Sequence, residues 1–378
     1  MSIIIFIIVL GILVLVHELG HFIAAKKAGC YVEEFGIGFP PKVWAKKVGE
    51  TIYSLNWIPL GGYVKIQGEN GDFDDESIVE GYDPSKSFSA KSLSWRALII
   101  TAGVLMNILL AYVLISITLI PGVPVVIEEG VEYGKYAQFD NREILVSQVL
   151  KNSPAESANI QARDVLLQIN GESIYTAKNL QELLSTTSNT SLSIDLKRGD
   201  NVINTEATPI HIEEINSTGL GIGFTETAEL SYPWWSVLWY GLVRTITILG
   251  LIIVAFYELI VGFFSSGNVS AEVTGPLGIA VLTGAIAKEG IVQLTLFTAL
   301  LSLNLAIINI LPIPALDGSR LLSIIIEKVR GKKHNMKYER YAHMAGFVLL
   351  MLLMVVVTIK DVYRYGGDIW QGVVNLFT

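Results

Sequence analysis

A His-Glu-x-x-His motif occupies residues 17 to 21 of this 378-residue chain. His17 and His21 are four residues apart, so on a helix both imidazoles lie on one face and can bind one metal ion. Two neutral imidazoles leave room for a carboxylate and a water molecule, which is the arrangement of catalytic Zn2+. Glu18 lies beside the metal rather than on it, where it can take a proton from water. The motif therefore predicts a zinc hydrolase with Glu18 as the catalytic base.

The third ligand is expected to be a carboxylate, and Asp317 is the candidate. Pro312 and Pro314 interrupt helical hydrogen bonding just before it and can turn its side chain towards the histidines. Capping of the helix that follows is the other role open to this aspartate. Asn304 and Asn309 lie upstream, where their amides either join helices or hold a substrate backbone. A spacing of five residues, roughly 140° on a helix, lets at most one of them face the site.

Composition restricts the other kinds of chemistry. Cys30 is the only cysteine, so an intramolecular disulfide or a multi-thiolate metal site is excluded. The formal charge of −8, without a basic stripe that alternates with aromatic residues, argues against a nucleic-acid partner.

The chain is 51% hydrophobic and 16% charged, which is typical of an integral membrane protein. Four apolar segments are long enough to cross a hydrocarbon core of about 30 Å. A cleaved signal peptide is the alternative for the first segment, but no basic residue precedes Ile3 and cleavage would remove the motif. The four predicted transmembrane helices span 1–26, 97–120, 291–318 and 341–364.

The position of the motif strengthens the metal prediction. An ionisable residue within a span costs roughly 2.5 to 3.5 kcal/mol, and three lie within five positions of one another here. Metal binding offsets that cost. The alternative is that the motif reaches the membrane surface and binds no metal.

Positive charge predicts the orientation of the spans. Lysine and arginine are concentrated at 26–96 and 320–340, which should both face the cytoplasm, whereas the acidic stretch 121–290 should lie outside. His21 and Asp317 then lie at the same membrane face.

One further segment, 234–264, is apolar enough to be a fifth span. A crossing there would place Asp317 on the face opposite His21. Its charged residues, Arg244 and Glu258, and its tryptophan cluster favour an amphipathic helix along the outer interface. The whole chain is therefore predicted to be a polytopic α-helical protein with four spans.

Residues 142–226 are predicted to form an extracytoplasmic α+β domain that resembles a PDZ domain. Strand patterns begin at Ile144, Asp164 and Ser191, and a helix is expected near 176–187. Asn159 and Arg163 replace small residues that are common in that fold. Whether the domain binds peptides or only restricts access is open from the sequence.

Residues 27–96 are predicted to contain a β-hairpin that re-enters the membrane from the cytoplasmic side. Two apolar alternating runs, FGIGFPP and PLGGYVKI, surround a Lys-Lys-Val-Gly turn. Strand backbone is tolerated in a membrane only when it is buried in protein or lines a cavity. An open edge of this hairpin can pair with an extended substrate. The remaining predicted segments are a linker at 121–141, an interfacial helix with a linker at 227–290, a basic cytoplasmic segment at 319–340 and a tail at 365–378.

Taken together, HELGH, the two hairpin motifs, the single insert, Thr274-Gly-Pro and NLAIINILPIPALDG resemble the site-2 proteases, specifically their bacterial RseP-like group. The chain departs from the pattern at Ala102-Gly-Val and Asp317-Gly-Ser, where a proline and a second glycine are frequent. The resemblance implies zinc ligands at His17, His21 and Asp317, catalysis by Glu18, and substrate contacts from Asn304, Asn309, Gly61, Gly62 and Tyr63.

The resemblance further implies an intramembrane endopeptidase that cuts single-span membrane proteins, such as anti-sigma factors and remnant signal peptides. We expect a monomer in the lipid bilayer of a bacterial cytoplasmic membrane. A non-catalytic scaffold that binds exported peptides is the alternative, although Glu18 would have no use there. A metal transporter would need polar residues along several spans, and spans two and four are expected to lack them.

Overall fold

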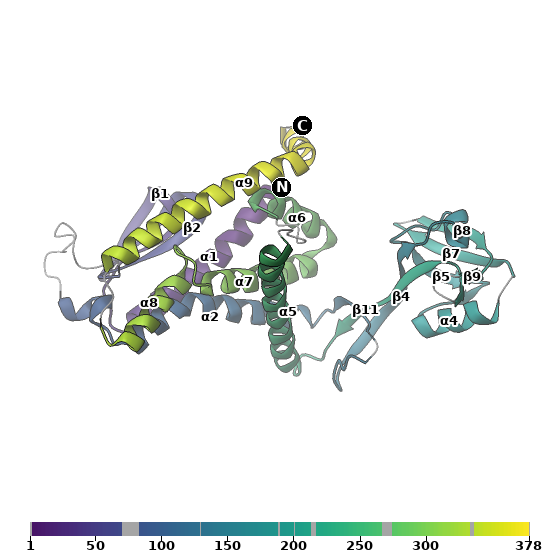
Figure 1. The fold of residues 1–378 in the computed structure, drawn as a ribbon, viewed down its shortest axis with the longest axis horizontal. Coiled ribbons are helices and arrows are strands. Elements are labelled where there is room, and N and C mark those ends of the chain that lie inside the picture. The colour runs from purple at the N-terminus through teal and green to yellow at the C-terminus, as the bar shows by residue number, and fades with distance from the viewer. Residues whose placement is uncertain are drawn as a thin grey trace. The chain divides into compact units, whose positions relative to one another are not determined.

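The computed structural model of the protein describes residues 2–69, 83–128, 130–187, 190–199, 201–212, 217–266, 274–332 and 336–377. The chain forms two compact units (Figure 1). Residues 1–116 and 241–378 make the first unit, and residues 117–240 make the second. The insert is thus continuous in sequence, whereas the unit that holds the motif is assembled from both ends of the chain.

Five helices of the described residues are long and apolar enough to cross a membrane. The sequence predicted four spans, and α5 is the additional candidate. Consecutive residues such as Ile253 and Val254 are both exposed on α5, so apolar side chains lie on more than one side of this helix. The five helices are α1 (Ser2–Lys27), α2 (Leu93–Thr118), α5 (Val237–Ser266), α7 (Ile291–Ile310) and α9 (Met336–Phe377).

Two shorter helices connect the long ones. Helix α6 (Pro276–Glu289) precedes α7, and α8 (Asp317–Arg330) follows it. Helix α6 was not specified within the predicted segment 227–290, whereas α8 is the helix that was expected to follow Asp317. Helix α9 also continues to Phe377, so the predicted tail at 365–378 is largely helical.

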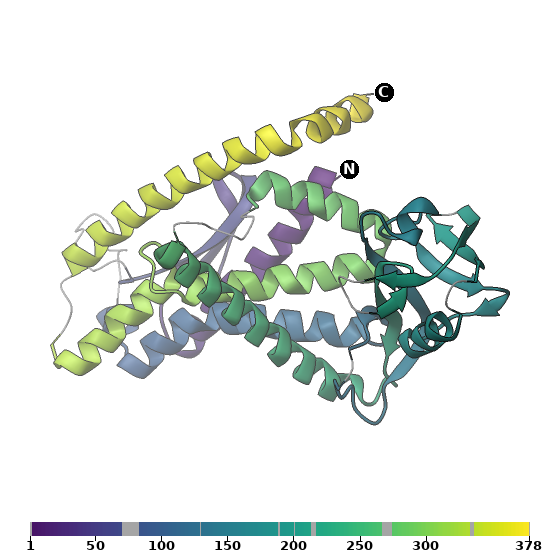
Figure 2. The ribbon, with the colours of Figure 1, turned by 45° about the vertical axis from the view of Figure 1, so that its right-hand side comes forward.

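Close contacts between backbones hold α1, α2 and α7 together. A Cβ atom at Gly20 of α1 would lie 2.4 Å from the carbonyl oxygen of Ala102 on α2, so only glycine allows this approach. The hydroxyl of Ser302 on α7 donates to the carbonyl oxygen of Asn107 on α2 at 2.8 Å. Helices α2 and α7 accordingly lie side by side (Figure 2).

A buried aspartate connects α9 with α6. Asp361 is 2% exposed and accepts hydrogen bonds from the backbone N–H groups of Gly275, at 3.2 Å, and Gly278, at 2.8 Å. These donors lie at the amino end of α6, where a carboxylate is favoured by the free N–H groups and the helix dipole. Asp361 on α9 and Asn107 on α2 show that the second and fourth predicted spans do contain polar residues, so that expectation was wrong.

Strands β1 (Val32–Val48) and β2 (Thr51–Ile66) form the predicted hairpin, with an additional fold within it. Phe35 pairs with Tyr53 on one side and with Val64 on the other, because β2 bends and returns along β1. Residues 62–66 therefore form one edge of the sheet and residues 42–48 form the other.

The insert is built on an antiparallel sheet with the strand order β3-β11-β4-β5-β7-β8 and with β6 paired to β5. Residues 123–126, which were predicted to belong to a linker, form β3, because β11 extends past the predicted boundary and pairs with them. The strands are β3 (Val123–Val126), β4 (Gln138–Val149), β5 (Val165–Ile169), β6 (Glu172–Ser173), β7 (Leu192–Arg198), β8 (Asn201–Ala207) and β11 (Ile222–Ser231). Two further strands, β9 (Ile210–Ile212) and β10 (Ser217–Gly219), pair separately.

Helices α3 (Pro154–Ser157) and α4 (Ala177–Thr186) complete the insert. Leu180 and Leu184 of α4 are buried in one core with Ile144, Leu166 and Ile194 of the sheet. The order of strands and helices in this domain matches the predicted order from Ile144 onwards.

Candidate metal centre

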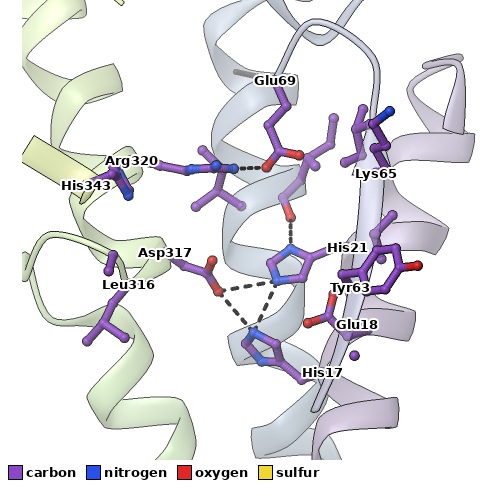
Figure 3. A pocket seen from close by; sticks show the side chains of 16 residues that line it. His17, Glu18, His21, Tyr63, Lys65, Glu69, Leu316, Asp317, Arg320 and His343 are labelled. Carbon is purple, nitrogen blue, oxygen red and sulfur yellow. Dashed lines mark hydrogen bonds and ion pairs between the residues drawn. The ribbon is translucent and has the colours of Figure 1, made fainter. Parts of the chain in front are cut away.

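Three side chains converge at the carboxyl end of α1 (Figure 3). Nε2 of His17 lies 3.0 Å from Oδ2 of Asp317 and 3.2 Å from Nε2 of His21, and Nε2 of His21 lies 3.3 Å from the same carboxylate oxygen. His17 is 7% exposed. Residues 300 positions apart in the sequence thus offer three ligand atoms to one point.

This triangle has the size of one face of a tetrahedral zinc site. Ligand atoms that lie about 2.0 to 2.2 Å from a zinc ion are separated from one another by roughly 3.3 Å. Two imidazole nitrogens with one carboxylate oxygen are a common ligand set for catalytic zinc, and the fourth position remains open to water. The three residues His17, His21 and Asp317 therefore fit the metal that the sequence predicted.

Helix α2 contacts the outer nitrogen of each imidazole. Nδ1 of His21 donates to the carbonyl oxygen of Ile99 at 2.8 Å. The side-chain amide of Asn107 lies 3.3 Å from Nδ1 of His17. Such outer contacts fix the orientation and the tautomer of a metal-binding histidine.

Gly103 lies between these two contacts on α2. A Cβ atom at this position would lie 2.4 Å from Nε2 of His21 and 2.7 Å from Cε1 of His17. The space that the imidazoles occupy is therefore available only because residue 103 has no side chain.

The turn before α8 places Asp317. Ala315 has a φ of 81°, which is a left-handed conformation, and Leu316 is the amino-terminal cap of α8 without a side-chain hydrogen bond. Asp317 is the first residue of the helix, and its carboxylate points to the histidines instead of capping the helix. Arg96 at the start of α2 holds α8 in place through hydrogen bonds of 3.0 and 3.1 Å to the carboxylate of Glu327.

Glu18 lies beside the ligands and against the edge of the hairpin. A Cβ atom at Gly62 would lie 3.1 Å from Cγ of Glu18. A cavity of about 460 Å³ is lined by Glu18, the three ligand residues and residues 62–66 of β2. The open edge of the hairpin sheet thus borders the space in which the metal site lies.

Of the two asparagines of α7, only one reaches the site. Nδ2 of Asn309 lies 3.4 Å from Nε2 of His17, whereas Nδ2 of Asn304 donates to the carbonyl oxygen of Leu300 in its own helix at 2.9 Å. This agrees with their spacing of five residues, which lets one of the two face the metal.

The hairpin residues singled out by the sequence also differ in position. Gly62 and Tyr63 line the cavity, and the Tyr63 hydroxyl donates to the carboxylate of Glu34 at 2.8 Å. Gly61 has a φ of 130° and lies against the ring of Phe39, so it shapes the bend of β2 and is not among the residues that line the cavity.

Four further polar or charged residues lie at the cavity. Arg320, one turn after Asp317 on α8, is paired with Glu69 just beyond β2. Lys65 and His343 also line the cavity, and Figure 3 shows His343 next to Arg320 and Lys65 on the hairpin side. None of these four residues was predicted.

Two residues that shape the metal site were also missed, Gly103 and Asn107. Asn107 is an isolated amide within an apolar run, and such residues in a span mark a polar site. For Gly103 the only signal was its position in Ala102-Gly-Val, which was noted as a departure from the family pattern and gave no indication of a contact with the histidines.

Comparison with known proteins supports a protease. The chain is 35% identical over 351 residues to a Clostridium perfringens protein named as a zinc metalloprotease, and the match covers 93% of this chain and 95% of that protein. It is 30% identical to the Regulator of sigma-W protease RasP of Bacillus subtilis, with 96% of this chain and 98% of that protein covered.

Among solved structures, the PDZ domain of an SdrC-like protein from Listeria monocytogenes matches 21% of this chain and 85% of its own, with 20% identity and a TM-score of 0.20. The family model for peptidase family M50 matches residues 5–353. With its apolar helices and its histidine and carboxylate site, the chain is an intramembrane zinc metalloprotease that belongs to peptidase family M50.

Proposed function

We propose that the protein cleaves peptide bonds within or beside the transmembrane segments of single-span membrane proteins. One observation carries the proposal: Glu18, the His17, His21 and Asp317 ligand set, and the free edge of the hairpin all border one cavity. A hydrolytic site and a surface that can hold an extended peptide are thus adjacent.

His17, His21 and Asp317 would hold the zinc ion, which supplies Lewis-acid activation of water and of the scissile carbonyl group. Glu18 takes a proton from the attacking water, whose oxygen joins the carbonyl carbon. As the carbon–nitrogen bond breaks, Glu18 passes this proton to the leaving nitrogen, so the products are a carboxylic acid and an amine. The amide of Asn309 lies close enough to His17 to bind the substrate backbone at this point.

The substrate would bind as an extra strand along residues 62–66. Among the described residues, this edge pairs with β1 on one side only, so an extended peptide can pair with the other side. A substrate helix must unwind locally to do so. Strand addition of this kind recognises backbone, which suits an enzyme that acts on several single-span sequences.

Helix direction supports four spans. The ligands lie near the carboxyl end of α1 and just after α7, whereas Ile99 lies near the amino end of α2. Helices α1 and α7 therefore run in the same direction and α2 runs in the opposite one, so the chain must leave α2 and enter α7 on one membrane face. A crossing by α5 would require a return crossing, and the 14 residues of α6 extend only about 21 Å. We infer that α5 lies on or enters the outer side without crossing.

The positive residues of 26–96 and 320–340 favour a metal site near the cytoplasmic face of a bacterial cytoplasmic membrane, with the insert outside. The strand and helix order of the insert is that of a PDZ-like domain, which would bind or exclude parts of substrates. The relative named as a regulator of sigma-W protease suggests anti-sigma-factor-like substrates. Remnant signal peptides form the second class, and the protein would act as a monomer.

Cleavage of a tagged single-span protein by the purified enzyme and by Glu18→Gln tests the proposal. We expect the variant to lose cleavage by a factor of about 100 or more and to retain zinc, because Glu18 moves protons but does not bind the metal. Zinc content is measured in both proteins.

Equal cleavage by the two proteins would reject Glu18 as the base. Absence of cleavage of any single-span protein or signal peptide by a zinc-loaded wild type would favour the scaffold alternative instead.

A further inference from the structure

The buried amide of Asn107 is unusual among the contacts of the metal site. The side chain is 0% exposed, and its Oδ1 atom has no hydrogen-bond partner in the described part of the chain. Its Nδ2 atom lies 3.3 Å from Nδ1 of His17. A buried amide oxygen without a partner has lost the hydrogen bonds that water gives it in the unfolded chain, so its position calls for a partner.

The geometry of His17 supplies that partner. Nε2 of His17 faces Asp317 and His21, so this nitrogen must carry the lone pair that binds a metal. In a neutral imidazole the proton then resides on Nδ1. An N–H group of Asn107 directed at an N–H group of His17 forms no hydrogen bond.

Rotation of the amide by about 180° about its terminal torsion exchanges oxygen and nitrogen, which have nearly the same shape. Oδ1 then lies near Nδ1 and accepts a hydrogen bond from its N–H group, so the oxygen gains a partner and two N–H groups no longer face each other. The same relation already exists for His21, whose Nδ1 donates to the carbonyl oxygen of Ile99.

We propose that Asn107 is a positioning residue that accepts a hydrogen bond from Nδ1–H of His17 through Oδ1 and so presents Nε2 to the zinc ion. This inference rests on the zinc site of the proposed function. Helix α2 would then fix both ligand histidines, through Ile99 and Asn107, which are eight residues and about two helical turns apart. The bond from Ser302 to the carbonyl oxygen of Asn107 holds this level of α2 against α7, the helix that leads to Asp317.

Zinc affinity of the purified full-length protein tests the role, measured by competition with a chelator. Asn107→Leu keeps the approximate volume but removes the acceptor, and we expect it to bind zinc about 10- to 100-fold more weakly. Asn107→Asp keeps an acceptor oxygen and should bind zinc at least as tightly as wild type. Thr101→Val, on the same helix, removes a hydroxyl that bonds only within α2 and should leave zinc affinity unchanged.

Wild-type affinity in Asn107→Leu would overturn the inference, and so would an Asn107→Asp variant as weak as Asn107→Leu, because a donor role would then explain the result. Nitrogen-15 NMR of histidine-labelled wild type gives an answer even if the variants do not fold. Both zinc-bound imidazoles should carry a proton on Nδ1, and a His17 without this proton would reject the proposal. A wild type that binds no zinc would contradict the proposed function itself, whereas an indifferent Asn107→Leu variant contradicts only this inference.

Discussion

Gly103 illustrates how a single missing side chain controls the metal site. Any Cβ atom there would lie within 3 Å of both ligand histidines. We therefore expect Gly103→Ala to displace the imidazoles and to weaken zinc binding about tenfold or more, although alanine favours helix formation over glycine. Gly11→Ala on α1 is the matched control, because nothing lies within 4 Å of its added Cβ atom. Equal zinc affinity in the two variants, measured by chelator competition, would show that the ligands can move aside.

Asp164 of the insert is buried, and Arg198 binds both of its carboxylate oxygens at 2.7 Å. Burial alone would raise the pKa of Asp164, but the hydrogen bonds from Arg198 and the Gln161 N–H lower it below its ordinary value. A carboxylate with a lowered pKa stabilises the fold above its unfolded pKa of about 3.9, and this contribution is lost as pH falls through the folded pKa.

We therefore expect Asp164→Asn to destabilise the insert by about 2 kcal/mol at pH 7, with a difference from wild type that shrinks below about pH 4. The measurement is the urea concentration at which the amides of β5 and β7 lose protection from hydrogen exchange. Glu182→Gln, at an exposed helical ion pair, should change stability by less than about 0.5 kcal/mol. A destabilisation by Asp164→Asn that persists unchanged at pH 2.5 would show that the charge of Asp164 does not contribute.

At the scale of residues, some features of the site could be predicted from the sequence and others could not. The two histidines followed from helical spacing alone, because four residues return to the same face. Asn159 and Arg163 occupy positions where small residues are common, and the structure gives the reason for that preference: the backbone is left-handed at both positions, with φ values of 56° and 76°. Asparagine tolerates this left-handed conformation more readily than arginine does, and neither conformation could be read from residue type.

At the scale of elements, the hairpin differs most from a simple reading of its sequence. Two strands were predicted, but the bend of β2 turns them into a sheet with two distinct edges, 62–66 and 42–48. Alternation of apolar residues predicts strands and not their partners, so the sequence left open which edge meets the cavity. Only residues of the first edge line it.

This asymmetry predicts where substrate is captured. A photo-crosslinking residue at Tyr63, in the Glu18→Gln background, should capture a single-span substrate. The same residue at Val48, which is 55% exposed on the opposite edge, should capture little or none, and we expect at least a fivefold difference in yield. Comparable yields at both positions would contradict strand addition at 62–66, and immunoblotting of the crosslinked species gives the answer.

At the scale of the whole molecule, hydropathy predicted the apolar helices well, because length and composition are enough for that purpose. It did not show that α6 and α8 are separate helices, since Gly275, Pro276 and the turn at Ala315 divide the chain through backbone geometry. Asp317 was predicted only because the two histidines, about 300 residues earlier in the chain, require a carboxylate as the third ligand. The contact of Asp361 with α6 had no local signal, because its partners are backbone N–H groups.

The proposed orientation predicts which surfaces a membrane-impermeant thiol reagent reaches. With Cys30 replaced by alanine, Tyr175→Cys in the insert should react in intact cells, and Val329→Cys on α8 should react only after the membrane is permeabilised. Both side chains are exposed, at 58% and 81%, so burial does not explain a difference. Labelling of Val329→Cys in intact cells would reverse the proposed topology.

The separation of 300 residues between His17 and Asp317 also has a consequence for biosynthesis. A ribosome that adds about 5 to 20 residues per second needs roughly 15 to 60 seconds to reach the aspartate after it has made the first histidine. During this interval the nascent chain holds two of its three ligands and no complete hydrolytic centre. The order of the ligands along the chain therefore keeps the enzyme inactive until most of it has been translated. Neighbouring nascent membrane proteins are not exposed to a partly synthesised but active protease.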